Sequence, residues 1–184
     1  YGANAVFVGG KNFSLRAKAS NFTIDDLQQG AIFCHEHNAK LYVTVNVYPH
    51  DEILKQIDEY LLDLDKVNID AIIVSSPYIV KRAKELGCKF ECHISTQVTT
   101  NNSQAIKYYE EMGCERVVLG REVTIQEMAE IKKKTNVELE VFIHGGLCSS
   151  YSGRCTLSNH MTNRDANRGG CAHSCRWNYK LYKN

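Results

Sequence analysis

The sequence lacks any run of apolar residues long enough to span a membrane, and we expect no secretory signal peptide. Its 184 residues are 43% hydrophobic and 23% charged, a composition typical of a soluble globular domain. The formal net charge of +1 gives no overall indication of a nucleic-acid partner. We therefore expect a soluble, cytoplasmic domain that makes no contact with a membrane.

Several well-known catalytic motifs are also missing. The sequence contains no GxSxG elbow and no HExxH helix, and its glycine-rich loop at residues 9–18 matches neither the P-loop nor the dinucleotide-binding pattern. These absences weaken the case for a serine hydrolase, a zinc protease or a nucleotide-binding protein. A hydrolase could still pair Cys148 with His144 as nucleophile and base, but three neighbouring cysteines would then have no role.

Cysteine, in contrast, is abundant: the sequence has eight, without a secretory signal, which points to a reducing compartment and to metal or redox chemistry. Four of them crowd into one stretch near the end: Cys148, Cys155, Cys171 and Cys175. Zinc sites usually contain closely spaced pairs, and only the last two cysteines form one, whereas iron–sulfur clusters accept ligands from separate loops. An iron–sulfur cluster is our main expectation, and zinc, disulfides or inert thiols remain alternatives. The other four, which show no ligand spacing, are expected to be packing residues: Cys34, Cys88, Cys92 and Cys114.

Short β-branched segments alternate with amphipathic segments along residues 1–144. Expected strands lie at 5–8, 41–47, 71–74, 90–96, 116–119 and 139–143, and expected helices near 24–37, 51–67, 77–86, 102–112 and 124–134. This alternation predicts an α/β fold with parallel strands and right-handed crossovers. Several strands alternate polar and apolar residues, which favours a barrel with a polar interior over a doubly wound sheet.

We therefore predict an incomplete (β/α) barrel like a TIM barrel over residues 1–144, followed within the same domain by a Cys-rich, cluster-binding loop region at 145–184. The sequence begins without Met and has only six strand patterns, so we expect it to be a fragment of a longer protein. From Tyr151 onward it carries six Lys or Arg and one acid, Asp165. This basic stretch is equally compatible with RNA phosphates and with an ordinary solvated surface.

Polar side chains on the inner wall or at the carboxyl ends of the expected strands are the candidates for catalysis and binding. We expect proton transfer from side chains on the polar face of two strands: His93, Glu140 and His144. We expect substrate binding by polar residues in the strand-end loops: Arg16, Asn46, Gln97, Arg121 and Glu122. Each has a plainer interpretation as well, since His93 could be a core residue, and Glu140 or Glu122 could simply pair with a neighbouring cation.

Three motifs carry a resemblance to a known family. They are Glu140-x-Phe142-x-x-Gly145-Gly146-Leu147-Cys148, then Gly153-x-Cys155-x-Leu157-Ser158, then Asn167-Arg168-Gly169-x-Cys171-Ala172-x-x-Cys175-Arg176-Trp177. Together they resemble the signature of the collagenase-like peptidases, family U-thirty-two, and most closely its tRNA-hydroxylating members. Two residues depart from the family pattern: Gly146 stands where it has Ser or Ala, and His173 where we expect Gln.

The resemblance implies an enzyme that hydroxylates the wobble uridine of tRNA with an iron–sulfur cluster, suspected to be [4Fe–4S], and with prephenate as the suspected source of the hydroxyl group. It places Cys148, Cys155, Cys171 and Cys175 as cluster ligands, and Arg16 and Arg121 as partners for a dicarboxylate. A splayed base would be read by stacking and by hydrogen bonds, for which Tyr48, Tyr151, Asn46 and Gln97 are candidates. A peptidase, or a subunit whose metal is not catalytic, remains the alternative, and a partner subunit is possible.

Overall fold

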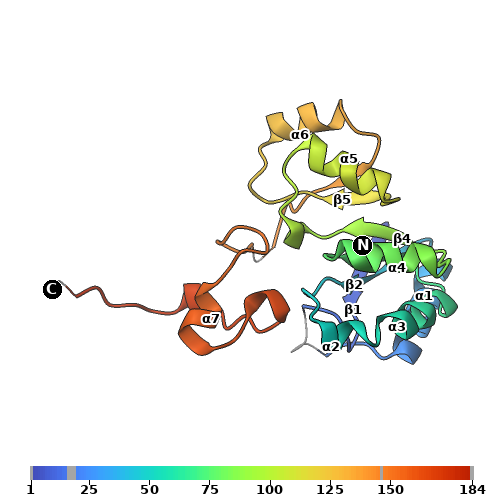
Figure 1. Cartoon of the computed structure of the whole chain (residues 1–184), viewed down its shortest axis with the longest axis horizontal. Coiled ribbons are helices and arrows are strands. Elements are labelled where there is room, and N and C mark those ends of the chain that lie inside the picture. Colours follow the sequence, from blue (N-terminus) through green and yellow to red (C-terminus); the bar gives the residue numbers. More distant parts are fainter. Residues whose placement is uncertain (1, 16–19, 146, 183–184) are drawn as a thin grey trace.

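A computed structural model of the chain describes residues 2–15, 20–145 and 147–182 (Figure 1). Its six strands lie in one sheet in sequence order, and every neighbouring pair is parallel. Helices connect the strands, and the sheet curls into an incomplete α/β barrel (Figure 1), which confirms the predicted fold. The strands are β1 (Ala5–Gly9), β2 (Lys40–Val45), β3 (Ala71–Val74), β4 (Glu91–Ile94), β5 (Arg116–Val118) and β6 (Glu138–Glu140).

The connecting helices begin and end at residues whose chemistry suits those positions. Thr23 and Asp26 form a capping box at the start of α1, and Thr124 and Glu127 form another before α6, so both hold backbone N–H groups that the helix leaves free. Gly87 ends a helical stretch at a φ of +72°, a left-handed conformation that glycine adopts without strain. The helices of the barrel are α1 (Ile24–Glu36), α2 (Asp51–Leu54), α3 (Ile57–Lys66), α4 (Pro77–Glu85), α5 (Ser103–Glu111) and α6 (Ile125–Lys132).

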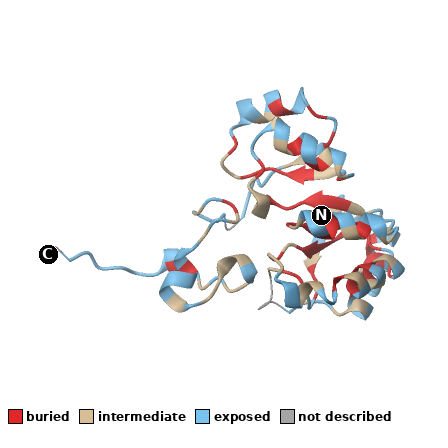
Figure 2. Cartoon of the chain, in the orientation of Figure 1, coloured by how far each residue is buried: buried red, intermediate tan, exposed pale blue. Residues whose placement is uncertain are grey.

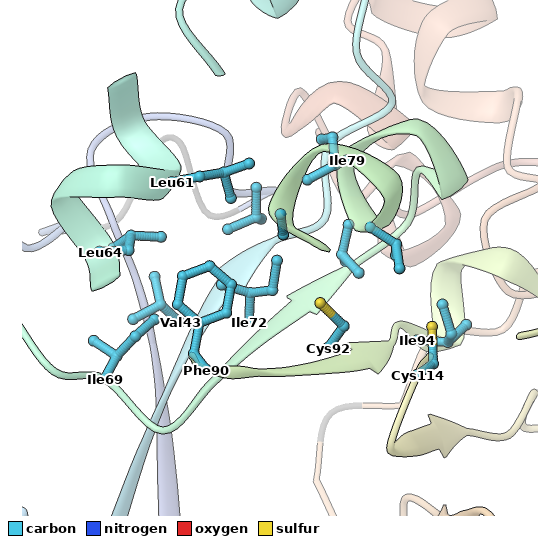
Figure 3. Close-up of a cluster of buried hydrophobic side chains, with 14 of the residues drawn as sticks. Val43, Leu61, Leu64, Ile69, Ile72, Ile79, Phe90, Cys92, Ile94 and Cys114 are labelled. Atoms are coloured by element: carbon cyan, nitrogen blue, oxygen red, sulfur yellow. The ribbon is translucent and has the colours of Figure 1, made fainter. Parts of the chain in front are cut away.

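The strands separate an apolar outer face from a more polar inner face, as their alternation predicts. Val43 and Val45 of β2 belong to the main core with Ile72, Cys92 and the inward sides of the helices (Figure 3). Tyr42 of β2 packs on the other face with Ala71 and Ile73. The core therefore lies between sheet and helices, and the inner wall of the barrel is free to carry polar groups.

The Cys-rich region that follows β6 has little regular structure and projects beside the barrel (Figures 1 and 2). It contains the short helix α7 (Leu157–Thr162) and two single 3₁₀ turns, η2 (Ala166–Arg168) and η3 (Ser174–Arg176). A further 3₁₀ turn, η1 (Thr96–Val98), follows β4. Figure 2 shows that the barrel strands are mostly buried while the last residues of the chain are exposed.

Several boundaries differ from the expected ones, among them the end of β2 at Val45. β4 ends at Ile94 because Ser95 caps the turn η1 by accepting a hydrogen bond from Gln97 N at 3.3 Å. β6 ends at Glu140, and residues 141–145 leave the sheet. The single helix expected near 51–67 is divided into α2 and α3, because Gln56 leaves helical geometry with a ψ of 2°.

Among the helices in the part of the chain that the structure describes, none is long and apolar enough to cross a membrane.

Candidate functional site

A pocket of about 440 Å³ lies where the Cys-rich region meets the carboxyl ends of the strands. The cysteines of that region all line it: Cys148, Cys155, Cys171 and Cys175. The barrel side of the wall includes Gln97, which follows β4, and Arg121, which follows β5. Catalytic sites of β/α barrels lie at this end of the strands, because the loops there can vary without disturbing the core.

The thiols share one pocket but are not packed around a single point. Among the described residues, no three His, Cys, Asp or Glu side chains come close enough to hold one metal ion. An iron–sulfur cluster is larger than an ion, and its thiolate ligands arrive from separate loops. Cys148, Cys171 and Cys175 are exposed, so their Sγ atoms are free to bind such a group. Four thiols from separate loops are the kind of donor set that an iron–sulfur cluster uses.

Hydrogen bonds beside the cysteines hold the separate loops of the pocket together. Arg176, next to Cys175, donates from Nη2 to Leu147 O at 2.8 Å, and Leu147 precedes Cys148. Asn167 donates from Nδ2 to Cys155 O at 3.0 Å, and Arg164 donates from Nη2 to Cys171 O at 3.1 Å. The backbones of Cys155 and Cys171, and that of Leu147 beside Cys148, are thus each bonded by a side chain from another part of the same region.

Two of the predicted substrate-binding residues line this pocket. Arg121 lines it and donates from Nη2 to Ser150 O at 2.7 Å, and Gln97 lines it and accepts at its backbone oxygen from the Tyr48 hydroxyl at 2.6 Å. Burial raises the pKa of Tyr48, so its hydroxyl remains a proton donor. Arg154 also lines the pocket, and the wall is therefore positively charged beside the thiols.

The other predicted substrate-binding residues lie elsewhere. Glu122 points at the Cys-rich region, where its Oε1 accepts from Ser152 N at 2.9 Å. Asn46 accepts from Leu15 N at 3.2 Å and lines a separate cavity of about 60 Å³ inside the barrel, together with Glu140. That cavity has the volume of about two water molecules, too little for a base or a dicarboxylate. Arg16 and Gly146 lie outside the described residues.

Of the predicted catalytic residues, His93 and Glu140 lie on the same inner wall, and His144 lies apart from them. His93 on β4 is fully buried, and its Nε2 lies 2.8 Å from Glu91 Oε2. Glu140 on β6 accepts from Arg116 Nη1 at 3.2 Å. His144 is exposed, and it lies four residues beyond the end of β6, so the common strand face expected for Glu140 and His144 does not form.

A polar network on the inner wall accounts for His93 and Glu140 in structural terms. The Arg116 guanidinium bonds Glu138 through Nε at 3.0 Å and Glu140 through Nη1 at 3.2 Å, and it lies over the Tyr42 ring at 5.4 Å from its centroid. Tyr42 in turn meets the His93 ring edge-on, with the ring centroids 4.7 Å apart. Arg116 and Glu138 pair across the first residues of β5 and β6, at the end of the strands opposite the cysteine pocket.

Comparison with known proteins decides the family. The model of Peptidase family U32 matches residues 1–184, the whole chain. The chain belongs to peptidase family U32. Within this U32 chain, the cysteines of the pocket stand in the motifs that carry the family resemblance.

Relatives of this U32 chain include RNA-modifying proteins. It is 46% identical over 183 residues to tRNA hydroxylation protein P1 of Bacillus subtilis, covering 100% of this chain and 43% of that protein. It is 37% identical over 182 residues to the 23S rRNA 5-hydroxycytidine synthase of Escherichia coli, covering 98% of this chain and 27% of that protein. The U32 chain thus spans less than half the length of these curated relatives.

A solved structure of a U32 peptidase has the same fold. It superposes with a TM-score of 0.60 at 11% sequence identity, over 75% of this chain and 60% of that one. At this identity the similarity supports the barrel architecture and nothing about the reaction.

Ser152, Arg116 and Tyr48 hold the site or the barrel together, and sequence reasoning did not assign them these roles. The parity of β5 and β6 would have paired Arg116 with Glu138 and Glu140, because residues directly opposite in parallel neighbours share a face. Ser152 stands in a run of small polar residues and carries no local signal. Its importance comes from burial, which only the folded chain shows.

The two sets of cysteines should differ sharply in reactivity. Burial raises the pKa of Cys92 and of Cys114 to about 12, and it raises the pKa of Cys34 and Cys88 as well. A thiol reacts as the thiolate, so these four should resist alkylation in the folded protein. We expect iodoacetamide at neutral pH to label Cys148, Cys171 and Cys175 first in the metal-free protein, as peptide mass spectrometry would show. Equally fast labelling of Cys92 under native conditions would contradict the structure.

His93 should make the stability of the fold depend on pH. Burial lowers the pKa of His93, although the carboxylate of Glu91 acts in the opposite direction, and Arg116, Glu140 and Tyr42 face the same ring. The unfolded chain therefore binds a proton at a pH where the folded chain does not. We expect the contribution of His93 to the free energy of unfolding to be constant above its unfolded pKa of about 6.5. Below that pH the contribution should fall, by at most about 1.4 kcal/mol per pH unit. Urea unfolding of wild type and His93→Gln between pH 7.5 and 5 would test this, since the variant should lose that slope.

Proposed function

We propose that this U32 chain is part of an RNA hydroxylase whose iron–sulfur cluster is held by Cys148, Cys155, Cys171 and Cys175. The wobble uridine of tRNA is the proposed substrate, and prephenate is the proposed source of the hydroxyl group. The observation that carries the proposal is that all four thiols line one pocket at the carboxyl ends of the strands, where two arginines also line it. The names of the relatives support hydroxylation of RNA, in tRNA for one and in ribosomal RNA for another.

The cluster, when bound, would supply the one-electron chemistry that ordinary side chains cannot perform. The cysteine thiolates would hold it, and the bonds from Arg176, Asn167 and Arg164 to Leu147 O, Cys155 O and Cys171 O would hold the loops that carry them. The two guanidinium groups and the Asn167 amide bond backbone oxygens, which leaves the sulfur atoms free for iron.

Arg121 and Arg154 would bind the negatively charged co-substrate. Among the described residues the Arg121 guanidinium bonds only Ser150 O, so its remaining N–H groups can reach a carboxylate in the pocket. A guanidinium and a carboxylate form a bidentate, charge-assisted pair, which fixes the orientation of the acid. Two arginines on one wall suit a molecule with two carboxylates.

Tyr151 is the candidate for binding the nucleobase. Its side chain is 64% exposed and lines the same pocket, whereas Tyr48 is occupied by its bond to Gln97 O. An exposed aromatic ring beside a positively charged wall can stack a base while the arginines neutralise the backbone phosphates. This division assigns the base to the rim and the small acid to the interior of the pocket.

The test is complementation of a strain that lacks the gene, with the full-length protein and its variants. Digested bulk tRNA would be analysed for 5-hydroxyuridine by liquid chromatography and mass spectrometry. We expect wild type and Cys88→Ala to restore the nucleoside, and Cys148→Ala not to restore it. Cys88 is the matched control because it lies in the barrel and outside the pocket. Unchanged 5-hydroxyuridine in the deletion strain would refute the proposed substrate.

A peptidase is the second candidate, because the family carries that name. Cleavage of a collagen-like peptide by iron-free protein, blocked by iodoacetamide, would favour it over hydroxylation. The structure offers the thiol of Cys148 as nucleophile, but His144 makes no hydrogen bond with it among the described residues. The hydroxylase therefore accounts for more of the pocket.

A further inference from the structure

Ser152 is the point at which the Cys-rich region is fastened to the barrel. Its side chain is fully buried, although the adjoining Tyr151 is 64% exposed. A small polar residue is buried in this way when its polar atoms all find partners. Ser152 lies between Cys148 and Cys155 in the sequence, so its contacts bear on the positions of both thiols.

Polar atoms of Ser152 bond residues that follow two different strands. Its N–H donates to Glu122 Oε1 at 2.9 Å, and its Oγ lies 3.3 Å from the same oxygen. Its backbone oxygen accepts from the Thr99 hydroxyl, and its Oγ lies 3.4 Å from Thr96 Oγ1. Thr96 and Thr99 follow β4, and Glu122 follows β5, so one residue of the Cys-rich region bridges both strand ends.

The carboxylate of Glu122 is held in place for this contact. It lies over Gly120, where an added Cβ would come within 2.6 Å of Oε2. An ionised acceptor makes a stronger bond to an N–H than a neutral one. Glu122 is therefore already engaged by the protein, which distinguishes it from Arg121, whose guanidinium keeps N–H groups free for a ligand.

We infer that Ser152 and Glu122 are positioning residues that dock the segment 148–155 onto the strand ends and thereby set the places of Cys148 and Cys155. The docking follows from the contacts themselves. Its consequence for a bound cluster rests on the proposed function. Loss of the Glu122 carboxylate leaves the buried Ser152 N–H without its acceptor, and the segment then moves away from β4 and β5. Loss of the Ser152 hydroxyl removes its contacts with Glu122 and Thr96 and loosens the segment, while the backbone bonds of residue 152 remain.

Alkylation of Cys155 measures the docking without any metal. This thiol is half-buried in the folded chain, three residues from Ser152. In iron-free, full-length protein we expect Glu122→Ala to raise the rate of Cys155 labelling about tenfold, the factor that corresponds to one buried hydrogen bond of about 1.4 kcal/mol. Ser152→Ala removes only the hydroxyl contacts and keeps the backbone bonds of residue 152, so it should raise the rate by a smaller factor. Ser149→Ala is the matched control, because Ser149 is an exposed serine of the same loop.

Glu122→Gln provides a graded variant, since its amide oxygen can still accept from Ser152 N–H but carries no charge. We expect its labelling rate to lie between wild type and Glu122→Ala, whereas a residue that merely fills space would show no such order. Hydrogen exchange of the peptide spanning residues 148–155 should follow the same series. Equal rates in Ser152→Ala, Glu122→Ala and Ser149→Ala, with far-UV circular dichroism unchanged, would overturn the docking role.

Iron content separates this inference from the proposed function. If wild type binds iron, we expect Glu122→Ala to retain less of it after anaerobic purification than Ser149→Ala does, and equal iron in the two would overturn the positioning role. If wild type binds none, the cluster proposal fails, while the labelling series still decides whether the segment is docked through Ser152 and Glu122.

Discussion

Replacing Gly153 with Ala should detach the Cys-rich region from the barrel. Gly153 has a φ of +66°, and an added Cβ would lie 1.8 Å from Gln97 O and 2.9 Å from the Tyr48 hydroxyl oxygen. The first neighbour is backbone, which cannot rotate aside as a flexible side chain can. The substitution must therefore move η1 or expel the loop, and we expect a cost of about 3 kcal/mol or more.

Gly87→Ala is the control that separates steric overlap from backbone strain. Gly87 has a similar φ of +72°, but an added Cβ there would meet nothing within 4 Å. It should cost only about 1 kcal/mol, the usual strain of a left-handed alanine. We would measure both by urea unfolding and by hydrogen exchange of residues 148–155. Equal effects of the two substitutions would contradict the close approach of Gly153 to Gln97.

Removing single thiols of the pocket should abolish iron binding, the second large effect. A [4Fe–4S] cluster uses four cysteine ligands, so wild-type protein purified without oxygen should carry about four iron atoms per chain and absorb visible light. We expect Cys148→Ala, Cys155→Ala and Cys171→Ala each to lose most of the iron and the colour. Cys88→Ala, in the barrel, should keep both.

The pattern of iron loss also tests the shared pocket. Loss in every pocket variant and in no barrel variant is expected, because these cysteines alone line the pocket among the eight, all of which are described. Less than one iron atom per chain in the wild type would contradict the cluster. Stoichiometric zinc in its place would instead favour the structural-metal alternative.

The fold was largely predictable from local sequence. The alternation of strands and helices and the polar and apolar faces of β2 appear in the structure as expected. Strand ends were less predictable, because a strand stops where its neighbour stops bonding. β6 ends at Glu140 although the apolar pattern runs on to Ile143, which is 90% exposed.

The site was only partly predictable. The crowding of Cys148, Cys155, Cys171 and Cys175 along the sequence predicted a common site, and all four do line one pocket. The individual polar residues were harder, because strand parity says which face a residue occupies but not its height along the barrel. Glu140 thus faces the interior as predicted, yet it bonds Arg116 and lines a cavity distinct from the cysteine pocket.

The amino-acid sequence by itself determined the order of strands and helices, the two faces of the barrel wall and the cluster of thiols, because these depend on residues near one another in the chain. Tertiary structure alone decided that Ser152 and Glu122 join the Cys-rich region to β4 and β5, and that His93 is enclosed beside Tyr42 and Arg116. These contacts join residues that are distant in the sequence; Ser152 and Glu122, for example, are 30 positions apart. Which distant groups meet is set by the crossover connections and the curl of the sheet, which leave no mark in local spacing.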